Sequence, residues 1–115
     1  MQTAHIGSRA EWHAAEYLTA HGYDIIARNW RRRECEIDIV AIIDGRVHFV
    51  EVKYRGSDVA GSGLEYIGPA KLRRMQYAAR RWVAENDWHG EFVLSAVEVS
   101  GPEYDITAFI ESADL

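Results

Sequence analysis

The sequence predicts a single α/β domain over residues 1–115, with a mixed central sheet flanked by helices. The expected order is one helix, three strands, a second helix and two strands. Two observations lead to this class. Apolar residues recur at helical spacing in two separate segments, and the hairpin between those segments is apolar on both faces, as in strands at the centre of a layered domain. A chain of 115 residues is long enough for one core but not for two.

Local signals set the limits of each element. Gly22 is a typical stop for the first helix, and Pro69 is a typical first residue of the second. Asp44-Gly45, between apolar runs, is a strong two-residue hairpin turn. The expected elements are a helix at residues 8–21, a strand at 23–30, a basic link at 31–33, a hairpin at 34–55, a glycine-rich flap or plain connection at 56–68, a helix at 69–85, and strands at 92–99 and 104–110.

The hairpin turn also predicts which residues face one another. Centred on Asp44-Gly45, the hairpin pairs Val40 with Phe49 and Ile42 with Val47 on one face, and Ile37 with Val52 and Ile39 with Val50 on the other. At the open end, the same register pairs charged residues, namely Asp38 with Glu51 and Glu36 with Lys53.

The Asp38–Glu51 pair is the first candidate site. Side chains directly opposed on one face have Cβ atoms about 5 Å apart, a spacing at which like charges repel. Two carboxylates at this separation suit a hard divalent cation such as Mg²⁺, and Lys53 could polarise a water or contact a phosphate oxygen. Two alternatives stay open. Glu36 and Lys53 could form an ordinary cross-strand ion pair, or a one-residue slip could move Asp38 away from Glu51.

Several motifs together carry a family resemblance. Ile37-Asp38 followed by Glu51-Val52-Lys53 is similar to the PD-(D/E)XK nuclease signature, with isoleucine in place of the usual proline. The longer pattern, over about residues 5 to 99, closely resembles the UPF0102 (YraN-like) family of predicted endonucleases, related in fold to archaeal Holliday junction resolvases. The resemblance implies a restriction-endonuclease-like α-β-β-β-α-β-β core. The other motifs that carry it are Gly7-Ser8-Arg9-Ala10-Glu11, Arg28-Asn29-Trp30, Glu36-Ile37-Asp38-Ile39-Val40 and Lys71 before the second helix.

Position by position, the resemblance implies a metal site. Asp38 and Glu51 match acids that bind Mg²⁺ or Mn²⁺, and the backbone carbonyl of Val52 often completes the inner set of ligands. Lys53 matches a residue thought to assist the attacking water, and Glu11 matches a helix glutamate that reaches the same site.

Other residues would support the site or depart from the family pattern. Glu36 would orient Lys53, and Gln76 could reach the site, although a buried glutamine bonded to backbone is the commoner case. Cys35 stands where the family usually has glycine, and Val93 stands where an aspartate is common.

Glu11 has a second explanation. Ser8-x-x-Glu11 has the spacing of a capping box, in which the glutamate reaches back to the Ser8 amide. The helical wheel argues in part against the capping box, because it places Glu11 on the packed side of the helix with Ala14, Ala15 and Leu18.

The charge distribution favours a nucleic-acid partner. The net charge is −5, but residues 1–81 hold all 13 basic residues against 10 acidic ones, and residues 82–115 hold eight acidic residues. A basic side therefore survives on an acidic protein. Solvated side chains are the default, but the residues expected to contact phosphates are Arg31, Arg32, Arg33, Arg55, Lys71 and Arg74.

These observations predict a metal-dependent endonuclease acting on DNA, with branched or junction DNA among its expected substrates. The alternative is a non-catalytic nucleic-acid-binding or assembly module on the same fold, and a protein-interaction adaptor using the acidic C-terminal part is a third class. One cysteine, and no apolar run long enough to span a bilayer, indicate a cytoplasmic protein without membrane contact. Symmetric cutting of two strands would call for a homodimer.

Overall fold

The computed structural model describes residues 2–56 and 67–111, with side chains from residue 7 onward. Five strands form one sheet in the order β1-β2-β3-β4-β5. Only β3 and β4 are parallel among these neighbours, so the sheet is mixed and the predicted class is confirmed. The elements are α1 (Gln2–Ala20), β1 (Asp24–Arg32), β2 (Cys35–Ile43), β3 (Arg46–Arg55), α2 (Pro69–Glu85), β4 (Phe92–Ser100) and β5 (Asp105–Glu111).

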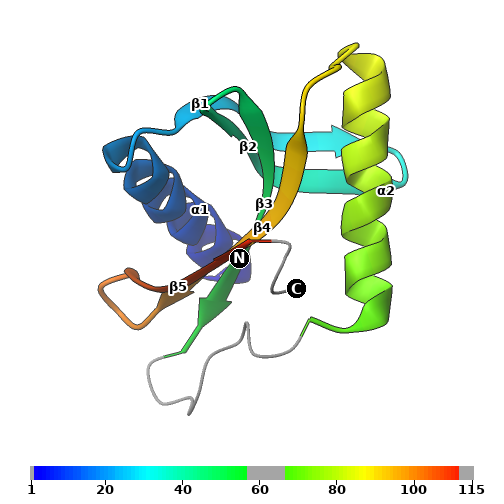
Figure 1. Cartoon of the computed structure of the whole chain (residues 1–115). Helices are drawn as coiled ribbons and strands as arrows, with labels where there is room; N and C mark the ends of the chain where they lie inside the picture. The colour runs from blue at the N-terminus through cyan, green and yellow to red at the C-terminus, as the bar shows by residue number, and fades with distance from the viewer. Residues whose placement is uncertain (1, 57–66, 112–115) are drawn as a thin grey trace.

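The two helices cover opposite faces of the sheet (Figure 1). On the α1 face the buried core includes Ala10, Ala14 and Leu18, and on the α2 face it includes Ala79 and Trp82. Burial of each large apolar side chain contributes about 1.5–3 kcal/mol, so both helices are held by packing. Neither helix, as far as the structure describes the chain, is long and apolar enough to cross a membrane.

The central hairpin forms around the predicted turn. Asp44 and Gly45 have φ values of 52° and 73°, which are the positive angles of a type I′ turn. The predicted register is confirmed at all five pairs of this ladder, which are Ile39–Val50, Val40–Phe49, Ala41–His48, Ile42–Val47 and Ile43–Arg46.

Two predicted boundaries are wrong. The first helix begins at Gln2 rather than Ser8, because glycine and serine inside a helix cost only about 0.5–1 kcal/mol each and do not stop it. The basic link is shorter than predicted, since Arg31 and Arg32 belong to β1. Arg31 pairs with Glu36 across the strands, and this favourable cross-strand charge pair extends the ladder.

The remaining predicted elements lie close to their expected positions. The second helix has the predicted limits, with Pro69 in its first turn. The predicted flap at residues 56–68 falls, apart from its ends, outside the described residues.

Candidate metal and nucleic-acid site

The β2–β3 hairpin opens at the predicted acidic pair. Its last ladder pair is Ile39–Val50, one residue before Asp38 and Glu51. Beyond that pair the Val52 amide donates a hydrogen bond of 2.8 Å to Asp38 Oδ2. A carboxylate therefore takes the place that a backbone carbonyl of β2 would have in a continued ladder.

The alternation of β2 breaks at the same point. Ile39 packs on the α1 side of the sheet, but Ile37 packs on the α2 side with Phe49. The prediction that Ile37 and Val52 share a face is wrong, because Val52 packs against the α1-side core. The change of face lies at Asp38, between the two isoleucines.

Strand β1 is distorted opposite Asp38. The pairs Arg28–Ile39 and Trp30–Ile37 leave Asn29 across from Asp38, and Asn29 has a φ of 52°. This left-handed conformation is rare in a strand, and asparagine tolerates it better than most residues do. The sequence motif Arg28-Asn29-Trp30 thus has a structural reason at its central position.

Asn29 also contacts Glu11 on α1. The two side chains are hydrogen-bonded, and burial raises the pKa of the Glu11 carboxyl while Asn29 and Arg28 favour its ionised form. Ser8 lies inside α1, so the capping-box explanation of Glu11 is wrong. Glu11 instead faces the distorted part of the sheet, as the helical wheel indicated.

Asp38 is the electrostatic centre of the site. Burial and, after it, the Glu51 carboxylate raise its pKa to about 7, and Glu11 and Glu36 act in the same direction. The Val52 amide opposes the shift by stabilising the ionised form. Several acidic groups therefore act on one partly buried carboxyl, and any cation placed there would relieve their repulsion.

Lys71 forms an ion pair with Glu51. Its Nζ atom, from the first turns of α2, lies 2.6 Å from Glu51 Oε2. The predicted Glu36–Lys53 pair is wrong, because the strands have already separated there and Glu36 lies 3.3 Å from Arg31. Lys53 is exposed near the end of β3.

The oxygen donors at the open end fit a hard divalent cation in type. Asp38 and Glu51 supply carboxylates and Val52 supplies a carbonyl, the donor classes that Mg²⁺ prefers when it keeps several waters. Within residues 2–56 and 67–111, no three His, Cys, Asp or Glu side chains gather closely enough to form a complete cage. An ion held by Asp38, Glu51 and the Val52 carbonyl would therefore have coordination positions left for water.

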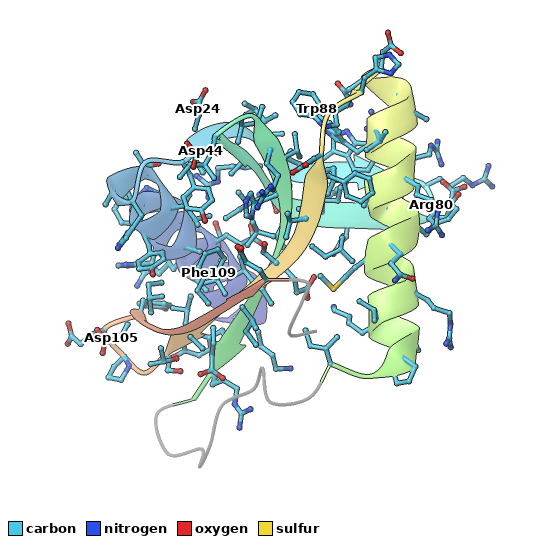
Figure 2. All side chains as sticks on the ribbon, viewed as in Figure 1. Asp24, Asp44, Arg80, Trp88, Asp105 and Phe109 are labelled. Carbon is cyan, nitrogen blue, oxygen red and sulfur yellow. The ribbon has the colours of Figure 1, made fainter. Side chains whose placement is uncertain are left out.

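A groove begins at Glu51. It has a volume of about 840 Å³ and lies between the β1–β2 turn and the first turns of α2. The basic side chains that line it are Arg32, Arg33, Lys71, Arg73 and Arg74. Figure 2 shows Arg80 on the outer side of the same helix, away from the sheet. The groove thus joins the acidic site to much of the basic charge of α2.

Ion pairs connect the β1–β2 turn to α2. Arg32 binds Glu85, and Arg81 binds both Glu85 and Glu34. We call these four residues the ionic clamp. Figure 1 shows the β1–β2 turn reaching past α2, and the clamp ties the two elements together there.

The other predicted site residues are less central. Gln76 is partly buried on α2 and, among the described residues, has no hydrogen bond to the acidic pair. Arg55 ends β3, where its carbonyl accepts a hydrogen bond from Gly101. Val93 pairs with His48, whereas Ala96 pairs with Glu51, so the departure at Val93 lies away from the acids.

Two features of the site were missed by sequence reasoning. Asn29 carried a signal, since it is a polar residue within a strand and is common at left-handed positions. The ionic clamp carried only a weak one, the i,i+4 spacing of Arg81 and Glu85, because its other partners are distant in sequence.

Fold and site together define an α/β protein with an acidic pair at the open end of a hairpin, beside a basic groove. The model of the "Uncharacterised protein family UPF0102" matches residues 10–108, and the chain belongs to this family. A UPF0102 protein of Mycolicibacterium smegmatis is 43% identical over 88 residues, covering 75% of this chain and 71% of the relative.

Two further relatives agree. The similarity to a UPF0102 protein of Leifsonia xyli is 46% identity over 77 residues, which covers 67% of this chain and 65% of the relative. A UPF0102 protein of Chlorobium limicola is 47% identical over 79 residues, which cover 68% of this chain and 60% of the relative. The family predicted from the motifs is confirmed.

Proposed function

We propose that this protein is a metal-dependent endonuclease that hydrolyses phosphodiester bonds in DNA, branched DNA included, and that it belongs to the restriction-endonuclease-like superfamily. The observation that carries the proposal is the opening of the β2–β3 hairpin. It leaves Asp38 on the Val52 amide, next to Glu51, at the start of a groove lined by cations.

Each side chain of the open end has a role in this proposal. Asp38, Glu51 and the Val52 carbonyl would hold Mg²⁺ or Mn²⁺, which when bound supplies a Lewis acid and lowers the pKa of a water. Lys53 would donate to the reacting water or to a phosphate oxygen. Glu11, oriented by its hydrogen bond with Asn29, would accept a hydrogen bond from a water near Asp38.

The groove would hold the substrate backbone. Arg33, Arg73 and Arg74 line it and, among the described residues, none of the three forms an ion pair with a carboxylate. Their guanidinium groups are therefore available for phosphate oxygens, which arginine binds in a bidentate manner. Binding through such contacts weakens as salt concentration rises.

The test combines metal binding with cleavage. Mg²⁺ and Mn²⁺ titration calorimetry and cleavage of junction and linear DNA would compare the wild type with Asp38→Asn, Glu51→Gln and Lys53→Met. Glu16→Gln, an exposed change on α1, is the control. We expect the Asp38 and Glu51 changes to abolish metal binding and each of the three to slow cleavage by at least about 100-fold, with the control unchanged.

The rival class gives a different result. A non-catalytic nucleic-acid-binding module would bind DNA in a salt-dependent manner, would cleave none with either metal, and would tolerate Lys53→Met. Unchanged metal affinity and cleavage in Glu51→Gln would also refute the proposed site.

A further inference from the structure

A second hollow lies on the other side of the protein from the basic groove. It is formed by α1 and the turn between β4 and β5, and its volume is about 410 Å³, within the range of roughly 300–1,000 Å³ found for small-ligand sites. Its residues share none with the groove or the acidic pair. They are Arg9, Trp12, His13, Pro102, Glu103 and Tyr104.

Four aromatic rings contact one another in a row along this hollow. His13 stacks on Tyr104 with ring centroids 5.1 Å apart and an interplanar angle of 7°, and Tyr104 contacts Tyr54 at 5.4 Å. Trp12 packs against the edge region of His13 at 5.0 Å, and it is 50% exposed. This row of rings thus ends in a large, half-exposed indole, which could pack against one further planar group.

The turn that presents Tyr104 is firmly held. Tyr104 has a φ of 57°, a left-handed conformation that costs a bulky residue about 1–3 kcal/mol. The Tyr54 hydroxyl donates to the Gly101 carbonyl at 2.9 Å, and the Gly101 amide donates to the Arg55 carbonyl at 3.1 Å. These bonds join the turn to the end of β3, next to Lys53.

We propose that this hollow, which we call the Trp12 platform, binds an unpaired nucleobase of single-stranded DNA. The inference deepens the proposed function, on which it rests, by naming the kind of strand that the protein holds beside its scissile duplex or junction. It assigns substrate recognition to residues outside the acidic pair and the groove.

The chemistry of the platform matches an unpaired nucleotide. Stacking on an aromatic side chain suits every base, because each base has a π-face. Arg9 provides a cation in the same hollow for the phosphate, and the Glu103 carboxylate can accept a hydrogen bond from an exocyclic amino group. A base paired within a duplex exposes no face for such stacking, so the platform would discriminate between strand types.

The link to β3 gives the platform a functional position. Tyr54 and Arg55 directly follow Lys53, and both are hydrogen-bonded to the platform's turn. A DNA strand seated between Trp12 and this turn would therefore contact a turn that is hydrogen-bonded to the end of β3, the strand that carries Glu51 and Lys53. Single-stranded regions next to a branch point are the substrates that such an arrangement would favour.

The test measures binding in EDTA, where cleavage does not interfere. Fluorescence anisotropy would follow three labelled DNAs of equal length: a mixed-sequence single strand, its duplex, and a strand of abasic sugar-phosphates. The variants are Trp12→Ala, Trp12→Phe and the control Phe92→Ala, which removes an aromatic side chain of similar exposure, 43%, at the opposite end of the β3–β4 ladder. Circular dichroism would confirm that each variant is folded.

We expect Trp12→Ala to weaken binding of the single strand by about 5- to 150-fold, the range found for loss of one base–aromatic stack. Trp12→Phe should retain most of the affinity, and Phe92→Ala all of it. The duplex and the abasic strand should bind equally well to the wild type and to Trp12→Ala.

Three results would overturn the inference. The first is that the wild type and Trp12→Ala bind the single strand with equal affinity. The second is that Trp12→Ala loses as much affinity for the abasic strand as for the single strand. The third is that the wild type does not bind the single strand. A dimer that Trp12→Ala dissociates, seen by sedimentation velocity without any base-dependent binding, would assign the platform to a second copy of the chain. Failure of the proposed function is separate, because it would appear as unchanged cleavage in Glu51→Gln whatever Trp12→Ala does.

Discussion

From the Asp44-Gly45 turn to Ile39–Val50, strands β2 and β3 pair residue by residue, whereas beyond Val50 they separate and Asp38 binds the Val52 amide. The closed half is largely apolar on both faces and packs under both helices. The open half places Asp38 beside Glu51 and meets Lys71. One hairpin thus contains a regular part, stabilised by burial, and an irregular part in which like charges meet.

The difference teaches how an unfavourable group of charges persists in a small protein. The regular ladder and its two cores hold the strands in register, so the repulsion around Asp38 cannot relax by a slip. A slip of one residue would turn every buried side chain of the closed half toward the opposite face. Changes in the two halves should therefore have opposite effects on stability.

The largest expected effect lies in the closed half. Phe49 is 2% exposed and contacts Trp82, with ring centroids 5.4 Å apart. Phe49→Ala should lower the free energy of unfolding by about 3–5 kcal/mol through lost burial and a cavity. Urea unfolding followed by circular dichroism measures this loss. If the alanine variant is unfolded, Phe49→Leu, for which a smaller loss is expected, is measured in its place. A loss below about 1 kcal/mol would contradict the role of this core.

The open half should respond in the opposite direction. The folded-state pKa of Asp38, about 7, lies above its ordinary value of 3.8, so ionisation of Asp38 opposes folding. The cost is absent at low pH and grows until the pH exceeds the folded-state pKa. Without metal, Asp38→Asn should therefore raise the free energy of unfolding by about 2–4 kcal/mol at about pH 8 and by little at about pH 4.

Urea unfolding in EDTA across this pH range would test the Asp38 prediction. Asp24→Asn, an exposed change on β1, serves as the control and should show no such trend. A gain in Asp38→Asn that is equal at both pH values would show that charge repulsion is not its source.

The turn should affect stability alone. Gly45 has a φ of 73°, so Gly45→Ala should lower the free energy of unfolding by about 1–2 kcal/mol. Gly7 lies inside α1 with nothing within 4 Å of an added Cβ, so Gly7→Ala should raise the free energy of unfolding by about 0.5–1 kcal/mol. Thermal unfolding measures both changes. Metal affinity should be unchanged in each, and a change in Gly45→Ala would mean that the two halves are coupled.

The smallest effect concerns Lys71. This side chain competes with any other cation for Glu51 Oε2, from which it lies 2.6 Å away. Lys71→Met should therefore strengthen Mn²⁺ binding by up to about fivefold, as expected for loss of a partly exposed ion pair. Titration calorimetry measures this, with Arg73→Met as the control from the same groove. Weaker Mn²⁺ binding in Lys71→Met would show that Lys71 supports the site rather than competing with it.

Much of the fold could be predicted because its signals are local. Asp44-Gly45 determines both the turn and the register, and Pro69 determines the start of α2. The start of α1 could not be predicted, since Gly7 and Ser8 are weak breakers that the surrounding helix overrides.

The site could be predicted only in part, because its details depend on contacts distant in sequence. The proximity of Asp38 and Glu51 could be predicted from the register, but the end of the ladder at Ile39–Val50 and the bond of Asp38 to the Val52 amide could not. The partners of Glu51 and Glu36 were also beyond prediction, since Lys71 comes from α2 and Arg31 from an extended β1.

The ionic clamp has a consequence for experiments in different buffers. It joins the two walls of the groove through side chains that are partly exposed to solvent, and such attractions weaken as dissolved ions accumulate around them. Added salt would then act twice, by competing for the phosphates and by loosening the walls that present the arginines. The logarithm of the DNA affinity would then fall more steeply with the logarithm of the salt concentration than the phosphate contacts alone predict. Glu85→Gln would bring this slope closer to the value that the phosphate contacts predict.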